Sequence, residues 1–195
     1  MKKFEKFDTA KIKTGGLFDP LPKGAYVIKI IKAVEEQNRN TDGSHLKIAF
    51  DIAEGEYADY YKKQFDANVS EDKHWPYDGV YNLTVPDDNS PQWMIDNFGT
   101  FVSMLEESND GYHWDWDEKK WKGLVIGALF RNEQSENNGN VYDHTRPHWF
   151  RSAQSVRDGK IGRLPKDKLI ASVASSSSPD TFMNVPDGAA DDIPF

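Results

Sequence analysis

Residues 90–105 read SPQWMIDNFGTFVSML, and the predicted fold depends on this stretch. Ser90 stands where a helix N-cap is expected, and Pro91 occupies the first helical position. The large apolar residues then recur at the spacing of one helix face, at Met94, Phe98, Phe101, Val102 and Leu105. The stretch predicts a helix that ends before Asn109-Asp110-Gly111.

Three predicted strands precede this helix. Residues 25–34 are rich in β-branched side chains and favour a long strand. In residues 46–52 apolar and polar side chains alternate, which is typical of a strand with one buried face. After Gly55, residues 57–65 are interpreted as a third antiparallel strand, and residues 70–88 as a loop.

Two predicted strands follow the helix, over residues 124–131 and from residue 141 to about residue 151. Three strands, a helix and two strands are the order of elements in the OB-fold, a five-stranded barrel that binds oligonucleotides or oligosaccharides. We therefore expect a mainly β protein, a five-stranded OB-fold barrel with one α-helix between strands 3 and 4. A general α+β sheet with one helix is the alternative. The predicted divisions are an N-terminal arm (1–22), the barrel (23–165) and a flexible acidic tail (166–195).

The composition of the chain excludes several kinds of functional site. The chain has 195 residues, no cysteine and a net charge of -8. Without cysteine, disulfides, thiolate metal sites and a cysteine nucleophile are excluded. The first six residues are positively charged, but no apolar run follows them, and no stretch is apolar for long enough to span a membrane. We expect a cytoplasmic protein without a signal peptide or membrane segment.

Charge is divided between segments of the chain. Seven Lys and Arg residues and only two Asp residues lie in residues 146–168. Residues 169–195 contain four Asp and no Lys or Arg. A negative total charge argues against a nucleic-acid ligand, since phosphates need cations, but a basic body joined to an acidic tail removes that objection.

The tail is rich in Ser and Pro and poor in large apolar residues, so we expect it to be disordered. Its tip, Asp191-Asp192-Ile193-Pro194-Phe195, resembles the C-terminal tip of bacterial and phage single-stranded-DNA-binding (SSB) proteins, in which acidic residues precede a final Ile-Pro-Phe. The resemblance implies a docking peptide for replication or recombination proteins such as a helicase, primase, polymerase or recombinase. The alternative is an acidic tail that only increases solubility. Two aspartates adjoin the tip, fewer than in many members of the family.

A second resemblance lies at the start of the body. Residues 21–30, Leu-Pro-Lys-Gly-Ala-Tyr-Val-Ile-Lys-Ile, resemble the opening of phage-encoded SSB-like proteins, where a Pro-x-Gly-x-Tyr turn enters the first strand. Together with the strand that follows, this resemblance covers about the first third of the chain, and it favours a phage source. Members of the SSB family work as monomers, dimers or tetramers, so the homo-oligomeric state stays open.

Binding of single strands without sequence preference needs cations for the phosphates and exposed rings for the bases. The predicted third strand places a ring next to an ammonium group on each face, and the sequence leaves open which face is core. The last two strands add arginines and aromatic rings, although core packing explains the rings of Trp149 and Phe150 as well as stacking does. The predicted DNA-binding residues are Tyr60, Tyr61, Lys62, Lys63, Arg131, Arg146, Trp149 and Arg151.

The sequence shows no Gly-x-Ser-x-Gly, Walker or His-Glu-x-x-His motif, and we expect neither an enzyme nor a cofactor. Trp114 and Trp116 are interpreted as structural rings that cover one end of the barrel. His113, Asp115 and Asp117 lie at alternate positions and are the weaker hypothesis of a divalent-metal site. Two other functions stay open: a metal-dependent nuclease built from scattered ligands, and an OB-fold protein adaptor that does not bind DNA.

Overall fold

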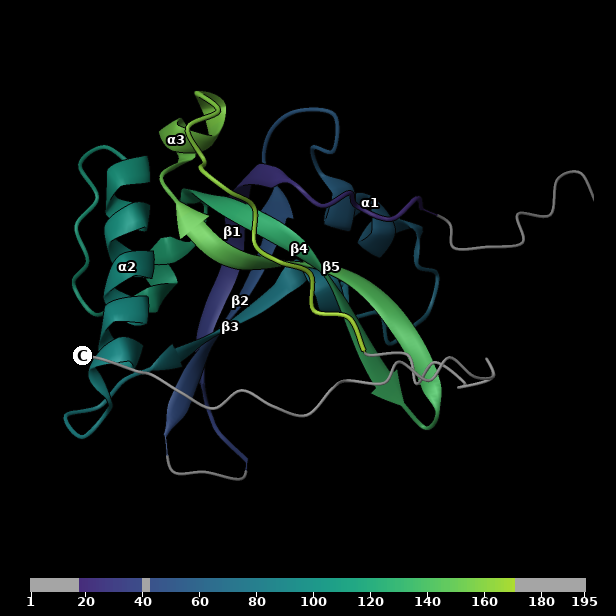
Figure 1. Ribbon diagram of the computed structural model, residues 1–195, viewed down its shortest axis with the longest axis horizontal. Helices are drawn as coiled ribbons and strands as arrows, with labels where there is room; N and C mark the ends of the chain where they lie inside the picture. Colours follow the sequence, from purple (N-terminus) through teal and green to yellow (C-terminus); the bar gives the residue numbers. More distant parts are fainter. Residues whose placement is uncertain (1–17, 40–42, 171–195) are drawn as a thin grey trace, which may run out of the picture.

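A computed structural model of the protein describes residues 18–39 and 43–170. Its centre is one antiparallel sheet with the spatial order β3-β2-β1-β4-β5 (Figure 1). The strands are β1 (Ala25–Gln37), β2 (Ser44–Ile52), β3 (Val80–Val85), β4 (Val125–Asn137) and β5 (Asn140–Arg151). The helices within these residues are α1 (Tyr60–Ala67), α2 (Gln92–Ser108) and α3 (Ala153–Arg157), with 3-10 turns η2 (Tyr77–Gly79) and η3 (Glu118–Trp121). The predicted mainly β class and its five strands are confirmed, but the described chain has three α-helices and not one.

The β1–β2 hairpin follows the apolar pattern of the sequence. Alternate side chains of β2, at Leu46, Ile48 and Phe50, are buried, as the period of two predicts. Ile30 of β1 lies opposite Phe50, and the register shifts just after Ile30 at a bulge. A bulge bends the strand and increases its twist. The first residues of β1 also pair with β4, so β1 lies at the middle of the sheet.

Helix α2 lies between β3 and β4, where the sequence predicts it. Its buried side chains are Phe98, Phe101 and Leu105. The predicted N-cap is wrong: Pro91 occupies the N-cap position, and the Ser90 hydroxyl accepts a hydrogen bond from the Asp87 N–H at 2.9 Å in the preceding turn. At the other end, the Asn109 side chain donates to the carbonyl oxygens of Leu105 and Val125, both at 2.7 Å. Asn109 therefore fixes the end of α2 to the start of β4.

The predicted third strand is wrong, because residues 60–67 form helix α1. The reason is a tertiary cap. The carboxylate of Asp51, buried at the end of β2, accepts hydrogen bonds from the N–H groups of Tyr61 (2.9 Å) and Lys62 (3.1 Å) in the first turn. The third strand is β3, inside the segment predicted as a loop.

Phe150 connects the two end strands of the sheet. Its ring packs 4.8 Å from that of Tyr81 on β3 and 4.7 Å from that of Phe101 on α2. The sheet is therefore curved enough for side chains of its first and last strands to meet. Within residues 18–39 and 43–170 no backbone pairing joins β3 to β5, so the sheet is open there.

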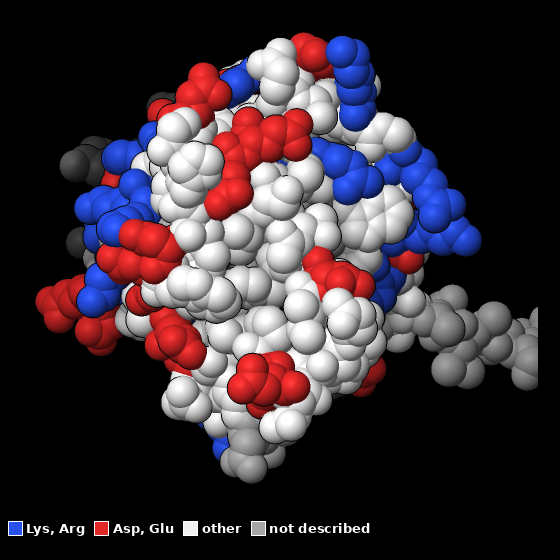
Figure 2. Space-filling model, turned by 90° about the vertical axis from the view of Figure 1, so that its left-hand side faces the viewer, with Lys and Arg blue, Asp and Glu red and all other residues white. Residues whose placement is uncertain are grey.

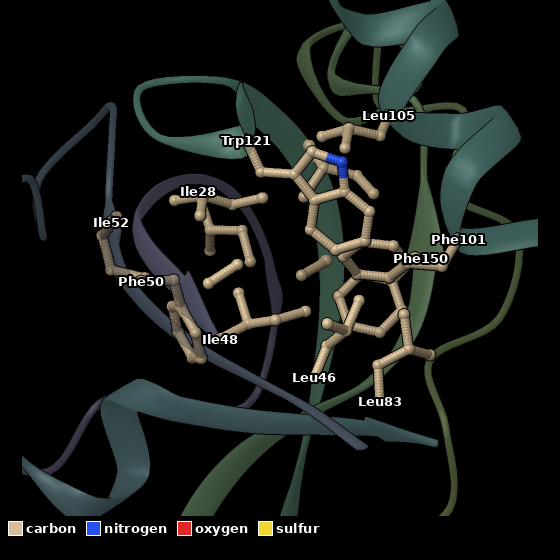
Figure 3. Packing of buried hydrophobic residues seen from close by; sticks show 14 of the residues in the cluster. Ile28, Leu46, Ile48, Phe50, Ile52, Leu83, Phe101, Leu105, Trp121 and Phe150 are labelled. Carbon is tan, nitrogen blue, oxygen red and sulfur yellow. The ribbon is translucent and has the colours of Figure 1, made fainter. Parts of the chain in front are cut away.

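The core lies between the curved sheet and α2. Trp121 of η3 is fully buried beside Leu105 and Phe150 (Figure 3), and its Nε1 donates to the Tyr112 hydroxyl at 2.8 Å. Trp114 packs on the Trp121 ring at 5.0 Å, in keeping with its predicted covering role. Trp116 does not share that role, because its ring is exposed. In the described part of the chain, no helix has the length and apolar character needed to cross a bilayer.

The last described residues pass back over the sheet. Helix α3 packs directly on β4 at Gly127, where an added Cβ would lie 2.6 Å from a methyl group of Val156. Beyond α3, the chain returns to β4 at Lys168. Its N–H donates to the Asn132 carbonyl and its carbonyl accepts from the Gln134 N–H, both at 2.9 Å. Residues 167–170 thus bind β4 at residues 132–134, on the same edge that pairs with β1 at residues 125–129.

Candidate nucleic-acid interface

A series of rings and guanidinium groups follows β5, the end strand of the sheet. We call these neighbouring side chains the β5 row, and they are Tyr77, Arg146, Arg131, His148, Trp149 and Arg163. Two of them come from segments outside β4 and β5, because η2 lies beside β5 and the segment after α3 crosses it. The row therefore collects three parts of the chain that are far apart in sequence.

Tyr77 begins the row with an exposed ring. Its side chain is 72% exposed, and the guanidinium carbon of Arg146 lies 4.0 Å from the ring centroid. The η2 turn that carries the ring is fixed from below, where the Trp75 indole N–H donates to the carbonyls of Gly79 and Phe50, both at 3.1 Å. The ring is thus held at the surface by the partly buried Trp75.

Asp78 connects η2 to the β4–β5 hairpin. Its carboxylate accepts a 2.7 Å hydrogen bond from Arg146 Nε and lies 2.9 Å from His144 Nδ1. His144 Nε2 lies 2.8 Å from the hydroxyl of Ser135, which is exposed toward the end of the hairpin. This hydrogen-bonded chain holds the hairpin against η2. Burial alone would lower the pKa of Arg146, but Asp78 raises it above its usual value.

Arg131 and His148 form the middle of the row. Arg131 is the register partner of Arg146, so their side chains lie on the same face of the hairpin. Arg131 Nη1 is 3.2 Å from His148 Nε2, and Arg131 Nε donates to Glu133 at 2.7 Å. Burial, and then the charge of Arg131, lower the pKa of His148 below its usual value. At neutral pH His148 therefore contributes a neutral ring.

Trp149 and Arg163 end the row. The rings of His148 and Trp149 are 5.7 Å apart, and the guanidinium carbon of Arg163 is 5.8 Å from the Trp149 ring centroid. Trp149 is half-buried and lies opposite Leu129, away from the main core cluster. Nearby, Arg151 Nη1 donates to the Phe150 carbonyl at 2.8 Å. The half-buried Trp149 indole thus lies beside the guanidinium group of Arg163.

The arginines at this surface outnumber the carboxylates that pair with them. Asp78 and Glu133 each neutralise one arginine of the row. Arg151 and Arg163 form no ion pair with any described carboxylate. The paired arginines are held in fixed positions, whereas the other two are available for phosphate.

The four predicted residues of α1 do not join the row. Tyr61 is buried against Phe50, and burial raises the pKa of its phenol well above the usual value. Tyr60 donates its hydroxyl proton to the Asp19 carbonyl at 2.7 Å. Lys62 is paired with Asp66, and Lys63 donates to the Ala58 carbonyl. The Tyr61 ring is not free to stack, because it serves the packing of α1, whereas the Tyr60 ring is half-buried.

Two hollows adjoin the β5 row. The larger, of about 650 Å³, lies between α1, residues 20–23, η2 and the hairpin, and Asp78 and His144 contribute to its wall. The smaller, of about 220 Å³, separates β3 from β5 and is lined by Tyr81, Arg146 and His148, among others. Tyr77 borders both. A strand laid along the row would therefore have space for bases on either side of Tyr77.

Two other predicted sites are the divalent-metal site and the C-terminal docking tip. Within the described ranges, no three His, Asp or Glu side chains are grouped so as to hold a metal ion. Asp115 is paired with Lys120, and Asp117 accepts a hydrogen bond from the Lys119 N–H at 3.1 Å. The predicted docking tip, residues 191–195, lies outside the described residues.

The predicted set of DNA-binding residues lacks three members of the row, Tyr77, His148 and Arg163. Tyr77 lies in a predicted loop, His148 lies on the last predicted strand, and Arg163 lies in the basic segment of residues 146–168. No local pattern could have paired Tyr77 with Arg146, because the contact is tertiary. The available signal is the Trp-Pro-Tyr-Asp-Gly segment, residues 75–79, because Pro, Asp and Gly favour a turn and turns lie at the surface.

No protein-family model matches the sequence, and a comparison with curated proteins finds no match.

Proposed function

We propose that the protein binds single-stranded DNA without sequence preference and that its sheet is an OB-type barrel. The strand order supports the fold: β1, β2 and β3 form a meander, β1 also pairs with β4, β4 pairs with β5, and α2 joins β3 to β4. The contact between Tyr81 and Phe150 supports the approach of the two end strands.

The β5 row is the observation that carries the proposal. Stacking on aromatic rings needs no particular base, because every base has a π face, and cations beside the rings attract the phosphates. Tyr77 and Trp149 are the stacking platforms, since each presents a ring supported by a guanidinium group. Arg151 and Arg163 bind phosphate. His148 adds a third ring beside Trp149.

The acidic tip completes the proposed function. We infer that residues 191–195 dock replication or recombination proteins while the body holds DNA, as in the SSB family that the tip resembles. A terminal phenyl ring and carboxylate suit an apolar pocket edged by Arg or Lys, and the two aspartates attract that pocket over a longer range. We assign the protein to a phage and to the cytoplasm of its host.

The test uses the pure full-length chain with labelled oligo-dT and with double-stranded DNA, each with and without magnesium. Tight, salt-sensitive binding of oligo-dT without cleavage is the expected result. Magnesium-dependent degradation would instead show a nuclease. Absence of binding to oligo-dT at low salt would leave the protein adaptor.

A second measurement separates the tip from the body. Deleting residues 191–195 should leave the affinity for oligo-dT unchanged and abolish binding to a helicase, primase, polymerase or recombinase of the same phage. The matched control replaces Asp180 and Asp187 by Asn, which removes the same amount of charge and keeps the tip. If that control lost partner binding equally, charge and not the tip would be responsible.

A further inference from the structure

A second surface, formed by α2 and the segment that follows it, is acidic and partly apolar. Residues 86–118 contain nine Asp and Glu and no Lys or Arg. Figure 2 looks onto the side of the molecule that carries α2 and shows acidic groups within a field of uncharged residues, with Lys and Arg along the left and right edges. Such a surface repels a polynucleotide, so DNA binding does not explain it.

Large apolar side chains lie on this surface, which we call the α2 face. Trp93 is 61% exposed, Trp116 is 79% exposed, and Ile95 is also exposed. Trp116 continues a row of rings from the core, because Trp114 lies 6.3 Å from Phe98 and 5.8 Å from Trp116. The buried indole N–H of Trp114 has no hydrogen-bond partner in the described part of the chain. Exposed indoles among carboxylates are typical of a surface that binds another protein segment.

Most carboxylates of the α2 face are available. Asp115 is paired with Lys120, but the other eight form no ion pair with a described Lys or Arg. Asp96 and Asp110 are exposed, and Asp96 accepts a hydrogen bond only from Gln92 of its own helix. A partner for this face therefore needs positive charge together with apolar side chains.

The chain itself contains a segment of that chemistry. Residues 1–17 include five Lys and two acidic residues, with Phe4, Phe7, Ile12 and Leu17 between them. The first described residue, Phe18, packs on Tyr60 of α1 at 6.5 Å. Figure 1 places α1 and α2 on opposite sides of the sheet. The segment therefore joins the body on the side away from its own α2 face.

We propose that residues 1–17 of one copy bind the α2 face of a second copy. Lysines pair with the free carboxylates, and the Phe side chains pack on Trp93 and Trp116. Because the two surfaces differ, the contact is heterologous and joins successive copies head to tail. The β5 row takes no part in it. Several copies could thus lie side by side along one strand, although the association itself does not require DNA.

The test is sedimentation velocity of the full-length protein across a range of concentrations at low and high salt. The expected result is an average mass that rises with concentration at low salt and falls to the monomer at high salt. Two variants should each stay monomeric: one lacks residues 2–16, and the other is Asp96→Lys with Asp110→Lys. The matched control is Glu71→Lys with Asp72→Lys, which makes the same charge change at exposed positions before η2 and should still associate.

Mixing the two monomeric variants is the decisive measurement. The Asp96→Lys/Asp110→Lys variant keeps its N-terminal segment and the shortened variant keeps its α2 face, so together they should form a 1:1 complex that grows no further. A monomeric full-length protein at every concentration, continued association of either variant, or failure of the mixture to pair would each overturn the proposal. Oligo-dT binding is measured separately on the same variants, so its failure would count against the DNA-binding function alone.

Discussion

Phe150 of β5 and Tyr81 of β3 are in edge-to-face contact, with ring planes at 67°, although their strands are the two ends of the sheet. The contact places the cationic side chains of β5 beside β3. It also makes Phe150 a common support for the sheet and for α2, since Phe101 packs on the same ring.

Replacing Phe150 by Ala is expected to lower the free energy of unfolding by about 3 to 5 kcal/mol, because it leaves a cavity between three elements. Urea denaturation of both proteins measures the difference. Val141→Ala is the control on the same strand, and its exposed position should change stability by less than about 0.5 kcal/mol. Equal effects of the two substitutions would contradict the assigned role of Phe150.

Tyr77→Ala is expected to weaken oligo-dT binding by about 1 to 3 kcal/mol, the usual contribution of one stacked base. Tyr77→Phe keeps the ring and should bind nearly as the original protein does. Fluorescence anisotropy with labelled oligo-dT measures both affinities. The stacking role would be excluded if the Phe variant lost as much affinity as the Ala variant, since the hydroxyl would then be the group that matters.

Arg163→Ala is expected to reduce the dependence of oligo-dT affinity on salt, with a log-log slope smaller by about 0.7, the value for one lost phosphate contact on a single strand. Lys160→Ala is the matched control, because Lys160 lies in the same segment but is paired with Asp158 at 3.1 Å. Titrations at several salt concentrations measure the slopes. An unchanged slope for Arg163→Ala would show that this residue does not contact phosphate.

Asp51→Ala is expected to destabilise the fold by about 3 kcal/mol, since the N–H groups at the start of α1 lose a buried, charged acceptor. Asp51→Asn keeps one acceptor oxygen and should lose less. Hydrogen exchange of the Tyr61 and Lys62 amides locates the effect. Protection that persisted at both amides in the Ala variant would contradict the capping role.

His148 makes stability depend on pH. Its folded pKa is lowered by burial and by Arg131, so the unfolded chain takes up the proton more readily. The contribution of the neutral His148 ring to the free energy of unfolding is fully present above about pH 6.5, the usual pKa of histidine. It is lost as the pH falls from there through the lower folded pKa. Between pH 7 and pH 5 the original protein should therefore lose more stability than His148→Gln. Urea denaturation at both pH values measures this, and exposed His74→Gln, the control, should behave as the original protein does.

Apolar spacing predicts β2 and α2, and β-branched and apolar runs between turn residues predict β1, β4 and β5. These patterns fail at residues 57–67, where the deciding interaction is the carboxylate of Asp51 and not a local pattern. Residues 70–88 are predicted as a loop, and the strand β3 with its apolar residues Val80, Leu83 and Val85 lies inside that segment.

Part of the candidate surface is predictable from the sequence, namely the residues that lie on correctly predicted strands. Arg131, Arg146 and Trp149 lie on strands with the expected register, and the structure brings them close together. Tyr60 and Tyr61 are predicted from the pattern of a pleated strand, but they begin helix α1, where Tyr61 is buried and Tyr60 is half-buried. Tyr77 joins the row only because η2 lies beside β5.

The hydrogen bonds between Lys168 and β4 fix the point from which the last 25 residues begin. Fully extended, a segment of that length spans at most about 85 Å. An enzyme that bound Phe195 would thus stay at high local concentration near any polynucleotide on the β5 row, even if its own affinity for DNA were weak.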